Sequence, residues 1–238
     1  MTTGTGLTVD VEALLGGLVL GLLTGRIMAE AVERIPAWME WQFAEQPGPC
    51  PLLQPLGKCR HAVLTPGLTA LLMSVVLWRF GWSLAGGAVV MLTVWLITLA
   101  LIDRDTHLLP DCLTLSGLWM GLLLAVTMPL QDPATAILGA ALGYLLLRVP
   151  ASVYEWLTGQ SGMGHGDFKL LAMVGAWLGP SPLLPIITLA CTGGALWAGW
   201  HVLRGHRAAA APLAFGPWLA SAAWVTLMWN PSLLSTAS

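Results

Sequence analysis

Two short segments of this chain place carboxyl groups beside long apolar stretches. The first is 102–111, Ile-Asp-Arg-Asp-Thr-His-Leu-Leu-Pro-Asp, and the second is 162–169, Gly-Met-Gly-His-Gly-Asp-Phe-Lys. Ionisable groups at the edge of apolar segments are costly, and for that reason they often have a function. Two neighbouring carboxyl groups cannot both ionise cheaply, so one holds a proton while the other stays anionic. Because the anion activates water and the acid protonates a carbonyl oxygen, such a pair can hydrolyse a peptide bond.

The same residues also have a structural interpretation. A segment such as 103–111 is usually a solvated connection, in which Asp111 caps the helix that follows. The glycines at 164 and 166 favour catalysis, because they let the backbone turn sharply and let a substrate strand pass close to Asp167. Lys169 is either a lysine that reaches the membrane edge or a cation that changes the acidity of Asp167.

The composition defines the class of protein in which such a pair would act. Hydrophobic residues make up 56% of the 238 residues and charged residues only 9%, whereas a soluble domain has about 25% charged residues. So few charges cannot cover a soluble globule, which excludes an ordinary soluble enzyme and predicts a membrane protein with several spans. The net charge of −2 and the lack of a basic run give no electrostatic support for nucleic-acid binding.

Intervals with few or no charges predict an all-α protein with about eight transmembrane helices. In chain order these intervals are 7–23 (apolar apart from Asp10 and Glu12), 61–78, 80–102, 112–131, 133–147, the short 168–178 (which includes Lys169), 183–203 and one centred on 212–229. All of the ten Lys and Arg residues except Arg79 then fall on one side. By the positive-inside rule this side is cytoplasmic and both termini are periplasmic. The same topology brings the segments 102–111 and 162–169 to the cytoplasmic face.

A transporter that moves protons or cations is the alternative from a different class. It would place acidic groups near the middle of the bilayer on broken helices. Only the first of the predicted spans contains Asp or Glu, so the pattern favours an enzyme.

The two segments resemble the paired motifs of the bacterial type IV prepilin peptidases, intramembrane aspartic proteases of the GxGD type. The matching stretches are Ala-Leu-Ile-Asp at 100–103, Leu-Pro-Asp at 109–111 with Leu-Thr-Leu at 113–115, 162–171, and Gly-Ala-Trp-Leu-Gly at 175–179. The resemblance covers essentially the whole membrane part and implies that Asp103 and Asp167 are the catalytic pair. The supporting residues of the motifs are Gly164, Gly166, Asp111 and Lys169.

This family removes the short basic leader of a prepilin or pseudopilin at the cytoplasmic face of the inner membrane. The resemblance therefore implies two partners, a pilin-like precursor and membrane lipid, and no nucleic acid. It also divides the chain into three parts: a first transmembrane helix at 1–32, a shortened cytoplasmic loop with an interfacial segment at 33–61, and a membrane peptidase core at 62–238.

The cytoplasmic loop departs from the family pattern. Many members also methylate the new amino terminus with S-adenosylmethionine, and their loop has two Cys-x-x-Cys pairs, the spacing of a zinc site. Here Cys50 and Cys59 are each half of such a pair, and His61 would give only a third ligand where structural zinc sites have four. We therefore expect no zinc, no cofactor for the peptidase reaction, and S-adenosylmethionine only if methylation is retained.

Overall fold

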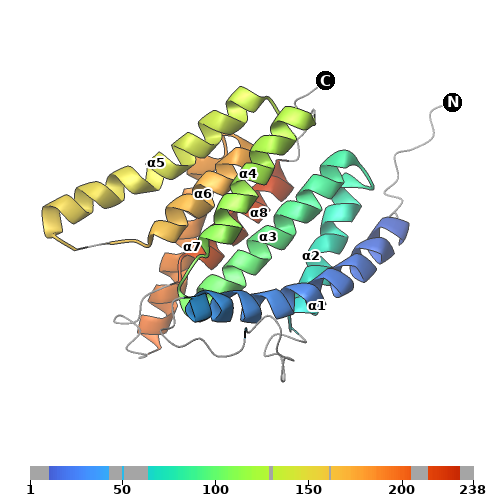
Figure 1. Ribbon diagram of the computed structural model, residues 1–238, viewed down its shortest axis with the longest axis horizontal. Helices are drawn as coiled ribbons and strands as arrows, with labels where there is room; N and C mark the ends of the chain where they lie inside the picture. The colour runs from blue at the N-terminus through green and yellow to red at the C-terminus, as the bar shows by residue number, and fades with distance from the viewer. Residues whose placement is uncertain are drawn as a thin grey trace. The chain divides into compact units, whose positions relative to one another are not determined.

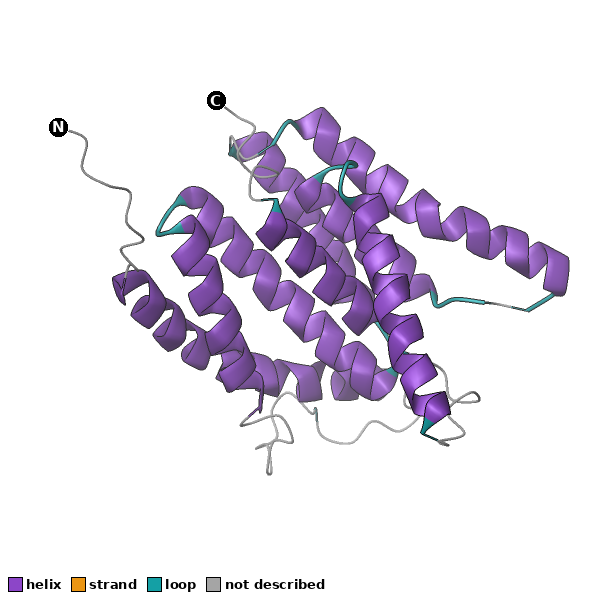
Figure 2. Cartoon of the chain, turned by 180° about the vertical axis from the view of Figure 1, so that it is seen from behind, coloured by secondary structure: helices purple, strands orange, loops and turns teal. Residues whose placement is uncertain are grey.

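A computed structural model of the chain describes residues 11–42, 50, 64–128, 131–160, 162–204 and 214–230. These residues form eight α-helices and contain no strand (Figures 1 and 2). The helices are α1 (Val11–Gln42), α2 (Leu64–Phe80), α3 (Leu84–Thr106), α4 (Asp111–Thr127), α5 (Pro133–Thr158), α6 (His165–Leu178), α7 (Leu183–Leu203) and α8 (Gly216–Trp229). The predicted all-α class is confirmed.

Several of these helices suit a lipid bilayer. Within the described parts of the chain, four helices are long and apolar enough to cross a membrane, namely α3, α5, α7 and Val11–Met39 of α1. The helices α2 and α4 are apolar but shorter. Many large apolar side chains are exposed, such as Trp119 on α4, Leu138 on α5 and Leu196 on α7, and lipid would cover them. The chain is a multi-pass membrane protein, whereas the count of eight spans and the side of each terminus stay predictions.

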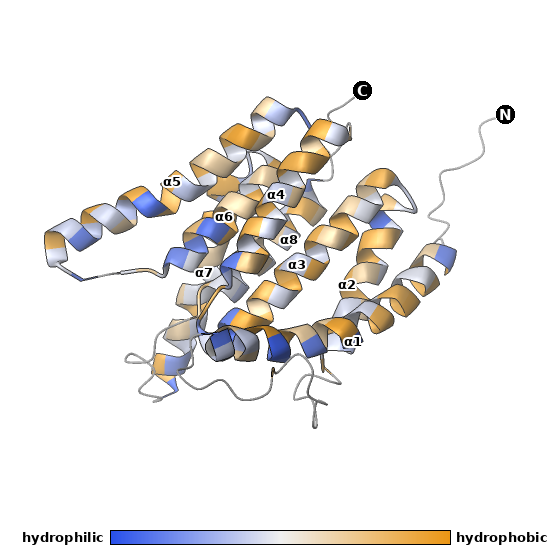
Figure 3. Ribbon diagram, viewed as in Figure 1, coloured by the Kyte–Doolittle hydropathy of each residue, from blue (hydrophilic) through white to orange (hydrophobic). Residues whose placement is uncertain are grey.

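Helix α5 is longer than the charge-free interval that predicted it. The interval ends before Arg148, but α5 continues through Pro150 and ends at Gly159, which has a left-handed backbone (φ 69°). The guanidinium of Arg148 lies 5.9 Å from the centroid of the Phe168 ring, so this charge has a partner within the protein. Figure 3 shows polar residues on this C-terminal part of α5 and on the first turns of α6. A charge therefore ended the apolar interval without ending the helix.

The chain divides into two units, Met1–Val94 and Trp95–Ser238. In the first unit, α1 and α2 pack closely through small residues. A Cβ atom on Gly17 would lie 2.6 Å from the Cα atom of Ser74, and the hydroxyl of Thr69 donates a hydrogen bond of 2.7 Å to the carbonyl oxygen of Gly21. This contact between backbones is typical of helix pairs in membranes.

In the second unit, α6 is the most buried helix. All of its residues from Leu170 to Leu178 are buried. A side chain on Gly175 would collide with the carbonyl oxygen of Gly139 in α5, and the indole of Trp177 donates a hydrogen bond of 2.8 Å to the carbonyl oxygen of Gly117 in α4. Because α6 is held by neighbours on several sides, a side chain at its N-terminal end has a well-defined position.

Candidate active site

Asp103 lies near the C-terminal end of α3, in the second unit, and is only 6% exposed. Its Oδ2 atom accepts a hydrogen bond of 2.9 Å from the N–H group of Gly216, the first residue of α8. This amide is available because the first N–H groups of a helix have no acceptor within the helix. Pro217 has no N–H group, and the next two amides of α8 bond to the carbonyl oxygen of Phe215, so Gly216 offers the free donor of this turn. A hydrogen bond from a helix N-terminus stabilises a carboxylate, so this bond favours negative charge on Asp103, whereas the burial of the carboxyl group opposes it.

Gly216 is a site residue that the sequence did not reveal. A Cβ atom at this position would lie 2.7 Å from Oδ2 and 3.0 Å from Cγ of Asp103. Gly216 is not among the glycines with a positive φ, so its backbone angles do not require glycine. Glycine is required because a side chain would prevent the close approach of the Asp103 carboxyl group. Phe215-Gly216-Pro217 does signal a helix start, but nothing local indicates a carboxyl group 113 residues away.

Asp167 lies in the first turn of α6 and is 8% exposed. With 14 residues, α6 is not one of the four candidate spans. Burial, and to a smaller extent the negative charge of Asp103, raise the pKa of Asp167 to about 7. At neutral pH Asp167 therefore holds a proton for much of the time, whereas the side chain of Asp103 is the one that accepts a hydrogen bond from a helix N-terminus.

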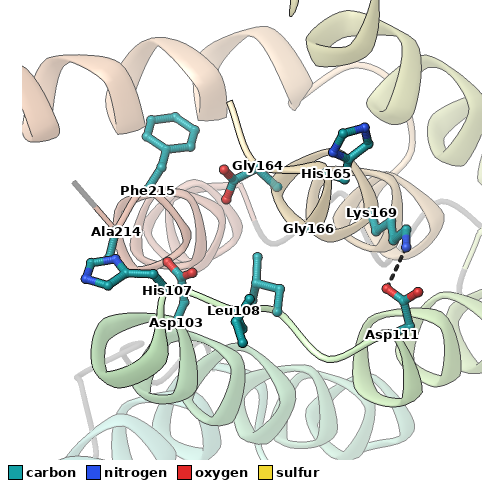
Figure 4. A pocket seen from close by; sticks show the side chains of 12 residues that line it. Asp103, His107, Leu108, Asp111, Gly164, His165, Gly166, Lys169, Ala214 and Phe215 are labelled. Atoms are coloured by element: carbon teal, nitrogen blue, oxygen red, sulfur yellow. Dashed lines mark hydrogen bonds and ion pairs between the residues drawn. The ribbon is translucent and has the colours of Figure 1, made fainter. Parts of the chain in front are cut away.

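Both carboxyl groups line one cavity of about 370 Å³ (Figure 4). Its walls come from the end of α3, the loop to α4, the starts of α4 and α6, and the two residues before α8. The lining residues other than the carboxyl pair are His107, Leu108, Leu109, Asp111, Gly164, His165, Gly166, Lys169, Ala214 and Phe215. A water molecule occupies about 30 Å³, so the cavity has room for water together with part of an extended peptide. The structure thus brings together all six motif residues identified in the sequence.

Asp111 and Lys169 form an ion pair at this cavity. The ammonium group of Lys169 donates a hydrogen bond of 2.5 Å to Oδ1 of Asp111 (Figure 4, dashed line). The capping role considered for Asp111 is wrong, because Pro110 occupies the N-cap position of α4 and makes no side-chain cap bond. Instead, the carboxylate of Asp111 joins the start of α4 to α6, the helix that positions Asp167.

Neither glycine of the Gly-x-Gly-Asp motif has a positive φ, so the turn that the N–H group of Asp167 closes with a hydrogen bond of 3.3 Å to the carbonyl oxygen of Gly164 does not depend on a left-handed glycine. A Cβ atom on Gly166 would lie 2.6 Å from Cβ of Leu109, so glycine lets the loop before α4 pack against α6. A Cβ atom on Gly164 would meet only Oδ2 of Asp167, at 3.6 Å. The missing side chain of Gly164 therefore leaves open the space in front of the carboxyl group, where we expect a substrate strand to pass.

Of the three zinc candidates from the sequence, only Cys50 lies within the described residues. Cys50 is partly exposed and forms no disulfide, whereas Cys59 and His61 lie outside the described residues. Among the residues that are described, no group of three or more His, Cys, Asp or Glu side chains could hold a metal ion.

Two buried carboxyl groups in one cavity of an all-helical membrane protein are an arrangement with which an aspartic peptidase could activate water. A family profile described as the type IV leader peptidase family matches residues 90–199, which include Asp103 and Asp167. The prepilin leader peptidase/N-methyltransferase of Xanthomonas campestris pv. campestris is 33% identical over 260 residues, which cover 90% of this chain and 91% of the relative. The protein of the same name from Pseudomonas aeruginosa is 42% identical over 172 residues, or 71% of this chain and 58% of the relative. The comparison with solved structures gave no match. The chain belongs to the type IV leader peptidase family.

Proposed function

We propose that this protein is an aspartic endopeptidase that removes the leader peptide of type IV prepilins or pseudopilins. The observation that carries the proposal is the burial of Asp103 and Asp167 in one cavity of a chain from the leader peptidase family. The names of the relatives point to the same substrate class.

The reaction needs only water and the two carboxyl groups. Anionic Asp103 takes a proton from water as the water oxygen attacks the carbonyl carbon of the scissile bond, and Asp167 gives its proton to the carbonyl oxygen. The tetrahedral intermediate then loses its C–N bond while Asp103 passes its proton to the leaving nitrogen. Asp167 recovers a proton from the hydroxyl of the intermediate, which leaves a carboxylic acid and an amine and restores the starting pair.

We further propose that the protein lies in the bacterial inner membrane and that the cavity opens toward the cytoplasm. The one-sided distribution of Lys and Arg supports this orientation. The exposed apolar side chains of α4, α5 and α7 support contact with lipid, and the transmembrane helix of the substrate would reach the cavity laterally, through the bilayer.

The proposal is tested by co-expression with a prepilin in a host that has no leader peptidase of its own. The leader should be removed only when this chain is present, and the mass of the pilin should fall by the mass of the leader. An unchanged precursor, in cells whose membranes contain normal amounts of this protein, would contradict the proposal.

The cleavage rate should depend on pH through the proton of Asp167. Because the pKa of Asp167 is about 7, the fraction of Asp167 that is protonated is high below this pH and falls as the pH rises through it. The initial rate of the purified enzyme in lipid vesicles should therefore decrease from about pH 7 upward, by up to about tenfold per pH unit. A rate that stays constant from about pH 6 to 9 would show that this proton is not needed.

We propose that the protein does not methylate its product, because Cys50 and Cys59 are all that remains of the cysteine pairs in the loop. The relatives are named both peptidase and N-methyltransferase, so mass spectrometry of the processed pilin is decisive. The new N-terminus should be unmodified, whereas methylation would make it about 14 Da heavier. Addition of S-adenosylmethionine should change neither the mass nor the rate.

A further inference from the structure

His107 has a backbone conformation that is uncommon for a residue with a Cβ atom. Its φ is 53°, and the other described residues with positive φ are the glycines Gly81, Gly159 and Gly179. The left-handed region is strained for a residue with a Cβ atom, so glycine usually occupies it, and asparagine, aspartate and histidine are the most enriched of the other residues. The chain therefore uses glycine at three of these four positions and histidine at the fourth, which lines the cavity.

The strained position is the C-terminal end of α3. The N–H group of His107 donates a hydrogen bond of 2.8 Å to the carbonyl oxygen of Asp103, and His107 directly follows the last residue of the helix. Glycine is the common residue at this point of a helix end, because only the backbone takes part. Glycine would serve equally well in the hydrogen bond that ends α3, so this bond does not explain the imidazole side chain.

The side chain of His107 lies beside Asp103 (Figure 4), and the two groups interact electrostatically. His107 is exposed, whereas Asp103 is buried. Of the other basic residues that line the cavity, Lys169 bonds to Asp111, and the ring of His165 lies 5.7 Å from that of Phe168. His107 is thus placed between solvent and the buried carboxyl group.

We propose that His107 is a positioning residue that acts through Asp103, holding this carboxyl group in the anionic form that activates water. This inference rests on the proposed peptidase function. The electrostatic interaction with His107 favours the anionic form of Asp103 and so works against the effect of burial on this carboxyl group. The strained backbone persists because the surrounding structure holds it, as is common at active sites.

The experiment compares the variants His107→Gly and His107→Asn in lipid vesicles with a purified prepilin. Both residues tolerate a left-handed backbone, so each preserves the helix end while removing the imidazole. We expect kcat to fall about tenfold or more in both variants with little change in KM, since the anionic form of Asp103 is needed in the chemical step. Added imidazole should restore at least part of the rate, because the removed side chain leaves space at an exposed position. Pyrazole, which has the same shape but is far less basic, should not restore it.

Three results would separate this inference from its alternatives. If either variant cleaves as fast as the wild-type protein, His107 serves only the backbone and the proposal fails. If the rate is lost and imidazole does not restore it, the imidazole has no chemical role and the proposal fails as well. If the wild-type protein itself cleaves no prepilin, the proposed peptidase function fails and the inference falls with it.

Discussion

Replacing either Asp103 or Asp167 by asparagine should abolish leader removal, with a loss in rate of about a thousandfold or more. Asparagine has nearly the same shape, but it can neither accept the proton of the attacking water at position 103 nor hold an acidic proton at position 167. Because each carboxyl group performs a different half of the proton transfer, neither should replace the other. The measurement is the amount of processed pilin over time, in cells that produce the two proteins together.

A matched control comes from the same segment of the chain. Asp105 is exposed and does not line the cavity, so Asp105→Asn should leave the rate near that of the wild-type protein. All three variants should reach the membrane in equal amounts, because asparagine creates no steric conflict. Normal processing by the Asp103→Asn or Asp167→Asn variant would show that the pair has been assigned wrongly.

The elements of the fold were predictable from the sequence because the bilayer imposes a simple rule. Few charges are tolerated within a span, so the charge-free intervals marked nearly all of the helices. The end of α5 was predicted too early, at Arg148, because a guanidinium group can lie within a helix when it packs over a neighbouring ring, here that of Phe168. Sequence patterns locate apolar stretches, but they do not show which charges have a partner from another helix.

The catalytic candidates were predictable for a different reason. Asp103 and Asp167 lie in motifs whose residue types already indicate their chemistry. The residues that hold them were not predictable, because Gly216 reaches Asp103 only through the packing of α8 near the end of α3. The role of Gly166 is similar, since its need for glycine comes from Leu109 on a different segment and not from its own backbone angles.

The second large effect is expected for Gly216→Ala. The added methyl carbon would lie 2.7 Å from Oδ2 of Asp103, so either the carboxyl group or the first turn of α8 must move. Both movements lengthen the hydrogen bond from the Gly216 amide, which is 2.9 Å long in the native arrangement. A displacement of this size at a reacting group can cost about a hundredfold in rate, and we expect a loss of at least that order in kcat.

The control for this substitution is Gly199→Ala in α7, where a Cβ atom would meet no other atom within 4 Å. Alanine also favours a helix over glycine, so this variant should be as stable as the wild-type protein and should cleave at the same rate. Thermal unfolding in detergent distinguishes a misplaced carboxyl group from a damaged fold, because only the latter would lower Tm by many degrees. A Gly216→Ala protein that unfolds normally and still cleaves at the wild-type rate would mean that α8 does not position Asp103. In that case the N-terminus of α8 would have no part in keeping this carboxyl group anionic.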